Sequence, residues 1–216
     1  ANERGVNAMV LLMQFALVGV FTALDGILFY VFWELTLVPI FLIALWYGAT
    51  DSKKSLIKFF IYTFVGSLAM LLSLMALGTQ AADFSHESLV AVQLTAKSAC
   101  WIMGGFFLAF AIKIPLFPFH TWQPATYTNA PMAGTMLLSG LMLKMALFGM
   151  IRWMIPLAPE ALFEMQFLVI TLGLIGIVYA AIIAIKQNDI KRIVAYSTLS
   201  QLGYMTVALG ASAYSV

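Results

Sequence analysis

The chain has 216 residues, of which 63% are hydrophobic and only 9% are charged, with a mean hydropathy of +0.99. Soluble domains carry about 25% charged residues, so this composition excludes an ordinary soluble protein and predicts a polytopic protein of the lipid bilayer. The net charge of +2 and the scattered basic residues exclude a nucleic-acid partner. The single Cys100 excludes an internal disulfide, a cysteine-ligated iron–sulfur cluster and a multi-cysteine zinc site.

Seven stretches of roughly 20 apolar residues are long enough to cross a bilayer. Each is expected to be a helix, because backbone groups in irregular lipid-facing chain would lack hydrogen-bond partners. The predicted fold class is therefore an all-α polytopic membrane protein with about seven transmembrane helices, one of them discontinuous. A single transmembrane domain is expected over residues 1–216. The spans cover about 6–22, 27–48, 55–78, 98–127 (interrupted by prolines), 132–155, 166–185 and 190–210.

Neither end of the sequence has a recognisable leader or tail. The chain starts at Ala1 without a basic segment and a small-residue cleavage site, and it ends in "ALGASAYSV" without a hydrophilic extension. We expect it to be a segment of a longer protein.

The basic residues of the loops divide unevenly between the two sides of the predicted bundle. Cytoplasmic loops of membrane proteins carry an excess of Lys and Arg, so the richer side is expected to be cytoplasmic. The turn at residues 120–131 then faces the cytoplasm, and His86, in the polar loop of residues 79–97, is expected to be solvated on the opposite side. The richer side holds Arg4, Lys53, Lys54, Lys58, Lys186, Lys191 and Arg192, and the other side holds Lys97 and Arg152.

Three charged residues, Glu34, Lys113 and Lys144, lie inside apolar spans rather than near their ends. Each is expected to cost about 2.5 to 3.5 kcal/mol at a helix centre, which indicates mutual pairing or a hydrated interior path. Lys144 is about 17 Å from either end of its span, farther than a lysine side chain reaches. A static pair between Glu34 and one lysine is the structural alternative, but it leaves the second lysine unexplained.

Pro39 follows Glu34 by five residues in the same apolar span. Pro39 cannot donate a backbone hydrogen bond, so it is expected to kink its helix one residue beyond Glu34. An ordinary transmembrane kink without any further role explains Pro39 equally well when it is considered alone.

Two more prolines follow the first buried lysine. Pro115 and Pro118 are expected to leave the carbonyl groups of Ala111 and Ile114 unpaired and to open the helix around Lys113. Broken helices at membrane depth are tolerated where they line a water-filled cavity, and in transporters they mark ion sites. The sequence therefore predicts a discontinuous helix at Lys113.

The depth of Lys113 follows from two tryptophans. Trp101 and Trp122 are 21 positions apart in the sequence, about 31 Å in a helix, which matches a hydrocarbon core with an aromatic belt residue at each face. Lys113 is then expected near the middle of the membrane. Residues 98–113 span only about 24 Å, so a second half-helix must complete the crossing.

These groups suit proton transfer. The charged form of a lysine loses stability in a low-dielectric interior and regains it beside a carboxylate, so movement of Glu34 would load or unload Lys113. Lys144, on the next helix, is the expected acceptor of a lateral step. His120, whose imidazole titrates near neutral pH, is either a relay group at the cytoplasmic end or a cap for the carbonyls of the break.

Three blocks of the sequence resemble the antiporter-like membrane subunits of respiratory complex I, the NADH:quinone oxidoreductase, and most closely its M-type (mitochondrial subunit 4) family. The resemblance implies two inverted five-helix repeats, the first over about residues 6–155 and the start of the second over about 163–216. It also implies a proton-relay role for Glu34, Lys113, Lys144 and His120. The blocks are "LFYVFWELTLVPIFLIALWYG", "AIKIPLFPFHTWQPATYTNAPMAGTMLLSGLMLKMALFGMIRW" and "QNDIKRIVAYSTLSQLGYM".

The function implied by the resemblance is proton translocation by a membrane-arm subunit in the bacterial plasma membrane, rather than in an organellar inner membrane. The chain itself is expected to hold no cofactor or metal and to catalyse no redox step, while partner subunits carry flavin and iron–sulfur clusters. Its partners are the other membrane-arm subunits and the lipid bilayer. The alternatives are a subunit of a multi-subunit cation/proton antiporter or of a membrane-bound hydrogenase, and, in another class, a structural membrane scaffold.

The sequence departs from the family at three positions. Family members often carry an acid and a second histidine after the break, where this chain has Ala125 and Tyr127. A histidine frequent on the last of these helices is replaced by Gln201. These differences concern the cytoplasmic access route rather than the three buried charges.

Overall fold

The computed structural model describes residues 3–49 and 52–212, and these residues form helices without any strand. One isolated antiparallel bridge joins Asp25 to Ser85. In chain order the helices are α1 (Glu3–Thr22), α2 (Gly26–Leu35), α3 (Leu37–Tyr47), α4 (Ser52–Gly78), α5 (His86–Val90), α6 (Ala96–Lys113), η1 (Phe119–Trp122), α7 (Gln123–Asn129), α8 (Met132–Leu137), η2 (Leu138–Met142), α9 (Leu143–Gly149), η3 (Met150–Met154), α10 (Ile155–Leu157), α11 (Pro159–Ile185) and α12 (Ile190–Ala211).

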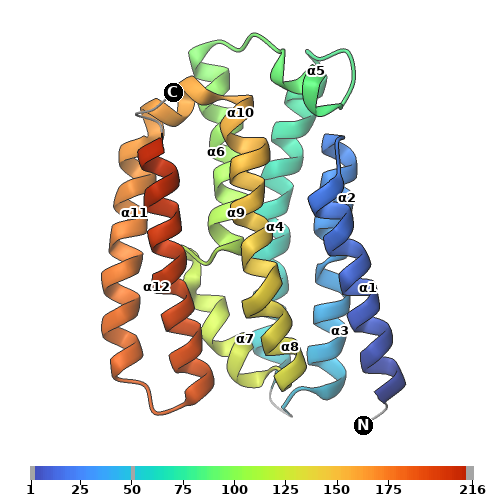
Figure 1. Cartoon of the computed structure of the whole chain (residues 1–216), viewed down its shortest axis with the longest axis vertical. Helices are drawn as coiled ribbons and strands as arrows, with labels where there is room; N and C mark the ends of the chain where they lie inside the picture. The colour runs from blue at the N-terminus through green and yellow to red at the C-terminus, as the bar shows by residue number, and fades with distance from the viewer. Residues whose placement is uncertain (1–2, 50–51, 213–216) are drawn as a thin grey trace.

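The long helices run side by side along one axis, with α5 and its flanking loops at one end (Figure 1). Six of the predicted spans are confirmed as helices long and apolar enough to cross a membrane, among the described residues. The seventh forms α12, a more polar helix that packs along α11. Helix α11 begins at Pro159, earlier than the predicted residue 166, because proline is favoured in the first helical turn.

The centre of the bundle is α6, which packs closely against α4. A Cβ on Gly105 would come within 2.8 Å of the Ala69 carbonyl oxygen and 2.1 Å of the Ser73 hydroxyl. Small residues at such a crossing let two membrane helices approach through their backbones. On its other side α6 meets α2, where the rings of Trp33 and Phe110 are 5.4 Å apart in an edge contact. The lower end of α6 is therefore fixed between two helices.

The polar loop of residues 79–97 folds over one end of the bundle. The His86 backbone N–H donates to the Leu24 carbonyl, and its ring Nε2 lies 2.8 Å from the Arg152 carbonyl oxygen. The imidazole also lies 5.0 Å from the Trp153 ring in an edge contact. The prediction that His86 is solvated is wrong, because α5 brings it down onto the helix ends.

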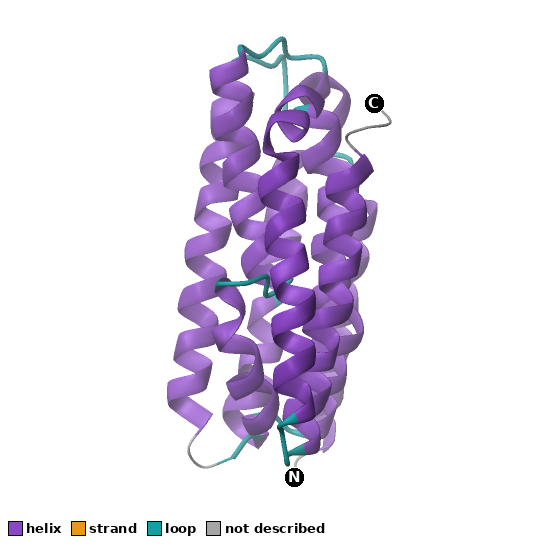
Figure 2. Ribbon diagram, turned by 90° about the vertical axis from the view of Figure 1, so that its left-hand side faces the viewer, coloured by secondary structure: helices purple, strands orange, loops and turns teal. Residues whose placement is uncertain are grey.

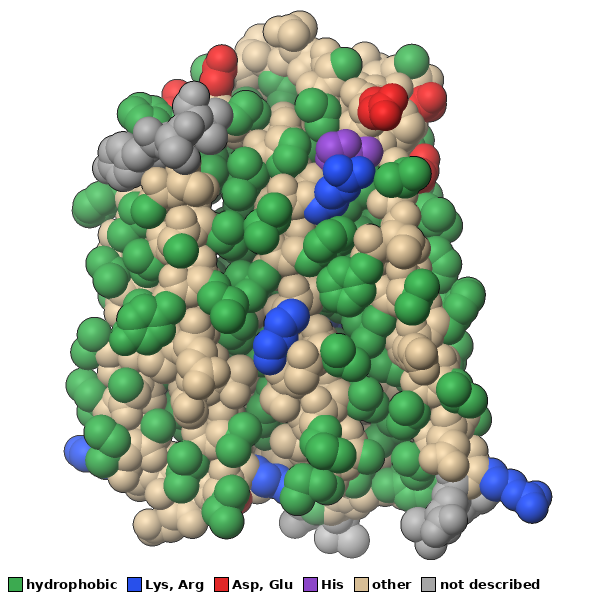
Figure 3. Space-filling view, viewed as in Figure 1, with side chains coloured by type: hydrophobic (Ala, Val, Ile, Leu, Met, Phe, Trp, Pro, Cys, Tyr) green, Lys and Arg blue, Asp and Glu red, His purple; other side chains and the backbone are tan. Residues whose placement is uncertain are grey.

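The two ends of the bundle differ in charge. Figure 3 shows acidic side chains at the upper end of one face and most of the basic ones at the lower end. At the basic end, Lys58 Nζ donates to the Thr121 carbonyl and Lys191 Nζ to the Ala130 carbonyl. The basic residues therefore gather at one end, as predicted, but residues 120–129 belong to the helices η1 and α7, so the prediction of a turn over residues 120–131 is wrong.

Candidate functional site

The discontinuous helix predicted around Lys113 is present. Helix α6 ends at Lys113, and the loop that follows crosses the bundle at mid-height (Figure 2). The second half of the crossing is made by η1 and α7. Lys113 therefore lies near the middle of the bundle, as predicted.

The backbone at this break is better satisfied than predicted. The Ala111 carbonyl accepts a hydrogen bond from the Leu116 N–H at 2.8 Å, so the expectation that it is unpaired is wrong. The Ile112 carbonyl accepts one from the Trp122 indole Nε1 at 2.9 Å. Trp122 is fully buried, so it is not the belt residue that its spacing from Trp101 suggested; Trp101 itself is 75% exposed. Trp122 instead fastens η1 to the end of α6.

The second predicted irregularity lies beside Glu34. Helix α2 ends at Leu35 and α3 begins at Leu37, so the kink is one residue beyond the acid, as predicted. At the junction, the buried Thr36 hydroxyl donates to the Trp33 carbonyl at 2.7 Å. Glu34 thus lies in the last turn of α2, where the Thr36 hydroxyl bonds to the Trp33 carbonyl.

Lys113 is 1% exposed, and its Nζ has no hydrogen-bond partner. The amine lies 5.2 Å from the centre of the Trp33 ring, a cation–π distance, and it interacts electrostatically with the Glu34 carboxylate. Glu34 is half-buried, and its Oε1 is also without a hydrogen-bond partner. Ser67, on α4, adjoins the same carboxylate. The structure therefore places the half-buried Glu34 near enough to the buried Lys113 to interact with it, and each has a polar atom without a hydrogen-bond partner.

More unpaired polar atoms follow in the second half of the broken helix. Four buried polar atoms have no hydrogen-bond partner there: His120 Nδ1, Gln123 Nε2 and Oε1, and the Tyr127 hydroxyl oxygen. Buried polar groups without protein partners are commonly bonded to ordered water. This half of the crossing is therefore suited to hydration, unlike the apolar segments around it.

His120 is 5% exposed and packs between two rings. Its imidazole stacks on Phe117 at 5.7 Å and meets Tyr179 of α11 edge-on at 5.0 Å. Its Nδ1 makes no hydrogen bond to a backbone carbonyl, whereas Trp122 does. Of the two roles expected for His120, Nδ1 does not fill that of a cap for the carbonyls of the break, and the relay role remains a prediction.

Residues 23–216 match the family described as NADH:quinone oxidoreductase/Mrp antiporter, TM. The chain belongs to this family. It is 42% identical over 204 residues to NADH-quinone oxidoreductase subunit M of Pseudomonas aeruginosa, covering 89% of this chain, and 38% identical over 200 residues to NADH-ubiquinone oxidoreductase chain 4 of Chondrus crispus, covering 92%. The chain spans 40% and 41% of the length of these two relatives.

Solved structures show the same helix arrangement for this family. A chain of respiratory complex I from Thermus thermophilus with bound NADH matches with a TM-score of 0.91 and 34% identity, over 96% of this chain and 45% of that one. A chain of the Mrp complex from Dietzia matches with a TM-score of 0.85 and 23% identity, over 95% of this chain and 23% of that one. The second similarity shows the fold alone.

Lys144, the third charge that the sequence places inside an apolar span, is exposed on α9. Its Nζ donates to the Ser139 carbonyl of the preceding segment, η2, which is a π-helix. Such π segments inside α-helices are frequent at functional sites. The structure brings Glu34 and Lys113 together and leaves Lys144 on the bundle surface, so a common row of the three remains a prediction.

The family departures lie around the second half-helix. Ala125 lines a cavity with His120, and Tyr127 is fully buried beyond it. Gln201 is exposed on α12. Ser67 and Tyr179 are among the residues around the site that the sequence did not single out, because a lone hydroxyl in an apolar helix carries no pattern that distinguishes it.

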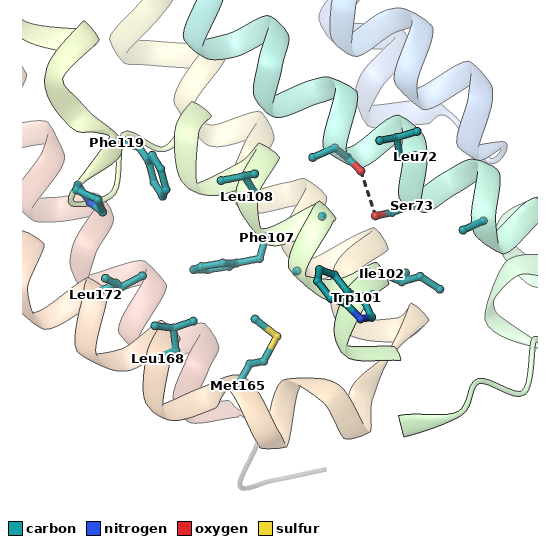
Figure 4. A pocket seen from close by; sticks show the side chains of 15 residues that line it. Leu72, Ser73, Trp101, Ile102, Phe107, Leu108, Phe119, Met165, Leu168 and Leu172 are labelled. Atoms are coloured by element: carbon teal, nitrogen blue, oxygen red, sulfur yellow. Dashed lines mark hydrogen bonds between the residues drawn. The ribbon is translucent and has the colours of Figure 1, made fainter. Parts of the chain in front are cut away.

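An apolar pocket of about 730 Å³ lies between α4, α6 and α11 and reaches Pro118 and Phe119 of the break. Leu108, Phe107, Met165 and Leu168 give it an apolar lining (Figure 4), and the Ser73 hydroxyl bonds to the Ala69 carbonyl of its own helix. None of its lining residues is ionisable, so it offers nothing for proton chemistry. Among the described residues, no group of three or more His, Cys, Asp and Glu side chains could hold a metal ion.

Proposed function

We propose that this chain is part of a proton-translocating membrane subunit of a NADH:quinone oxidoreductase in a bacterial plasma membrane. The observation that carries the proposal is Lys113, a buried amine without a hydrogen-bond partner at a mid-membrane helix break, beside Glu34. The names of the relatives support the assignment to this complex. The chain performs no redox step; partner subunits bearing flavin and iron–sulfur clusters drive it, and other membrane-arm subunits flank it.

The relay depends on the separation of Glu34 and Lys113. A buried ammonium group is unstable unless an anion or a dipole compensates it, so Lys113 holds a proton while the carboxylate is near and releases it when the carboxylate withdraws. The loop after α6 and the kink after Glu34 are the two places where the backbone can accommodate this change. Lys144 accepts the released proton in the next, lateral step. Each proton moved against 100 mV requires about 2.3 kcal/mol, which the partners must supply.

We also propose the repeat organisation implied by the family. Helices α1 to α10 make five crossings and form the first repeat, over about residues 6–155. Helices α11 and α12, an adjacent antiparallel pair (Figure 1), begin the second repeat over about residues 163–216.

A cation/proton antiporter and a membrane-bound hydrogenase use the same fold and are the alternative functions. Co-purification separates them: peripheral subunits that oxidise NADH through flavin and iron–sulfur clusters are expected, and a nickel site would identify a hydrogenase instead.

The relay is tested by Lys113→Arg in the assembled complex. The guanidinium keeps the positive charge but does not release its proton in proteins, so we expect assembly to persist and proton uptake per NADH to fall at least tenfold. Uptake is measured in membrane vesicles with a pH-sensitive dye, alongside NADH oxidation. The matched control is Lys97→Arg, an exposed lysine on the same helix. Normal uptake by Lys113→Arg would support a structural scaffold with a static charge pair.

A further inference from the structure

A small polar cavity lies between the second half of the broken helix and the pair α11–α12. Its volume is about 280 Å³, which leaves room for several water molecules. One wall is His120 with its chain neighbours, and the other wall is made of two tyrosines and an arginine. The lining residues are His120, Thr121, Pro124, Ala125, Tyr179, Arg192 and Tyr196.

The cavity extends from the buried His120 to the exposed Arg192 of α12. His120 lines the cavity and is only 5% exposed, and its Nδ1 has no hydrogen-bond partner. Tyr179 contacts His120 edge-on, and Tyr179 and Tyr196 line the same cavity. Arg192, next to Tyr196, is exposed. The side chains thus form a series from the surface to the buried imidazole.

We propose that this cavity is the cytoplasmic proton-uptake chamber of the Lys113 site, with Tyr196 and Tyr179 as its relay hydroxyls. The inference rests on the proposed function and adds to it the route by which protons reach His120. It uses α11 and α12, which contribute nothing to the Glu34–Lys113 pair.

The transfer is a series of proton hops without any redox change. Each tyrosine oxygen accepts a proton from the water on its aqueous side and gives its own hydroxyl proton to the water beyond, so the hydroxyl is unchanged afterwards. His120 takes the proton at Nδ1 and becomes an imidazolium. It then gives up one of its two ring protons towards the neutral amine of Lys113, whose lone pair forms the new N–H bond.

The charges around the chamber favour transit over storage. Lys58 of α4 acts on His120 from one side, and Arg192 of α12 carries a permanent charge at the other. None of the lining residues is acidic. A second positive charge on His120 is therefore disfavoured, so the imidazolium passes its proton on. Ala125 adds no polar group to its wall, so on the α11–α12 side the hydroxyls of Tyr179 and Tyr196 are the groups available to relay a proton.

The test uses the assembled complex in membrane vesicles, with NADH as the substrate and a pH-sensitive dye as the readout. Tyr179→Phe and Tyr196→Phe remove only a hydroxyl and keep the ring packing. We expect each to slow proton uptake about tenfold near pH 8.5, where protons are scarce, and little near pH 6. The matched control, Tyr204→Phe, removes a hydroxyl from an exposed tyrosine of α12 and is expected to change nothing.

Two further variants separate proton transfer from packing. Ala125→Leu narrows the chamber while both tyrosine hydroxyls are kept, and it is expected to reproduce the alkaline defect, so it decides the question if a tyrosine variant fails to assemble. Ala125→Asp adds a proton-carrying carboxylate to the chamber and is expected to restore uptake in the Tyr179→Phe background.

The outcomes distinguish this route from the function on which it rests. If Tyr179→Phe and Ala125→Leu match Tyr204→Phe at every pH while Lys113→Arg abolishes uptake, protons reach Lys113 by another path and the chamber is rejected. If Lys113→Arg pumps normally, the proposed function itself fails.

Discussion

Lys113 and Lys144 both lie within membrane-spanning helices, yet Lys113 is 1% exposed at a helix break whereas Lys144 is exposed on a helix that continues through it. The amine of Lys113 has no hydrogen-bond partner and interacts with Glu34, while that of Lys144 donates to the Ser139 carbonyl of its own helix. Two lysines at similar positions within their apolar spans therefore have different environments. The difference arises from the neighbours of each helix.

The helix that carries Lys113 is clamped, and the helix that carries Lys144 is not clamped near its lysine. A Cβ on Gly105, two turns before Lys113, would collide with the Ala69 carbonyl and the Ser73 hydroxyl, whereas a Cβ on Gly140, one turn before Lys144, would meet no atom within 4 Å. The tight crossing of α4 and α6 holds the Lys113 amine in an apolar environment that disfavours its charge. The protonation of Lys113 should therefore respond strongly to small movements of Glu34.

The largest expected effect comes from breaking this clamp. Gly105→Leu forces α6 away from the α4 backbone and is expected to destabilise the full-length protein by about 3 kcal/mol, with loss of the assembled complex from the membrane. Gly140→Leu, the matched change near Lys144, is expected to cost less than about 0.5 kcal/mol. Complex content on native gels and the thermal unfolding midpoint measure both. Equal losses for the two variants would remove the distinction between the two helices.

The sequence predicted those features of the Lys113 and Lys144 helices that depend on local residue types. Apolar runs identify the spans, and Pro115 and Pro118 identify the break, because a missing N–H is a local property. The burial of Trp122 could not be predicted, since a tryptophan at belt spacing has the same pattern whether its indole faces lipid or a backbone carbonyl. The π segment before Lys144 contains no proline, so the local sequence carried no signal for it.

The candidate site divides in the same way. The cost of placing Glu34 and Lys113 in hydrocarbon is evident from their positions, but their proximity depends on the crossing of α2, α4 and α6. His86 shows the opposite failure, because a polar loop predicts solvation unless one knows that α5 folds onto the helix ends. Tyr179 carried no signal, since its role arises only from its contact with His120.

The next largest effect concerns coupling between charges. In a double-mutant cycle on the thermal stability of the complex, Glu34→Gln and Lys113→Met are expected to show a coupling free energy of about 1 to 2 kcal/mol, because each group compensates the other in a low dielectric. Glu34→Gln with Lys144→Met is expected to be additive within about 0.5 kcal/mol. Additive effects for both pairs would mean that Lys113 is stabilised without Glu34.

The smallest effect tests whether the break at Lys113 is fastened. Trp122→Phe keeps the ring in its contact with Phe59 but removes the N–H that bonds the Ile112 carbonyl. The buried carbonyl is then left unpaired, so we expect a loss of about 1 kcal/mol in the free energy of unfolding and faster hydrogen exchange in η1. Trp101→Phe, at an exposed position on the same broken span, is the control and is expected to have no measurable effect. If Trp122→Phe also leaves the free energy of unfolding unchanged, the loop after α6 is held by other contacts. The greater rigidity around Lys113 than around Lys144 then comes from the α4–α6 crossing alone.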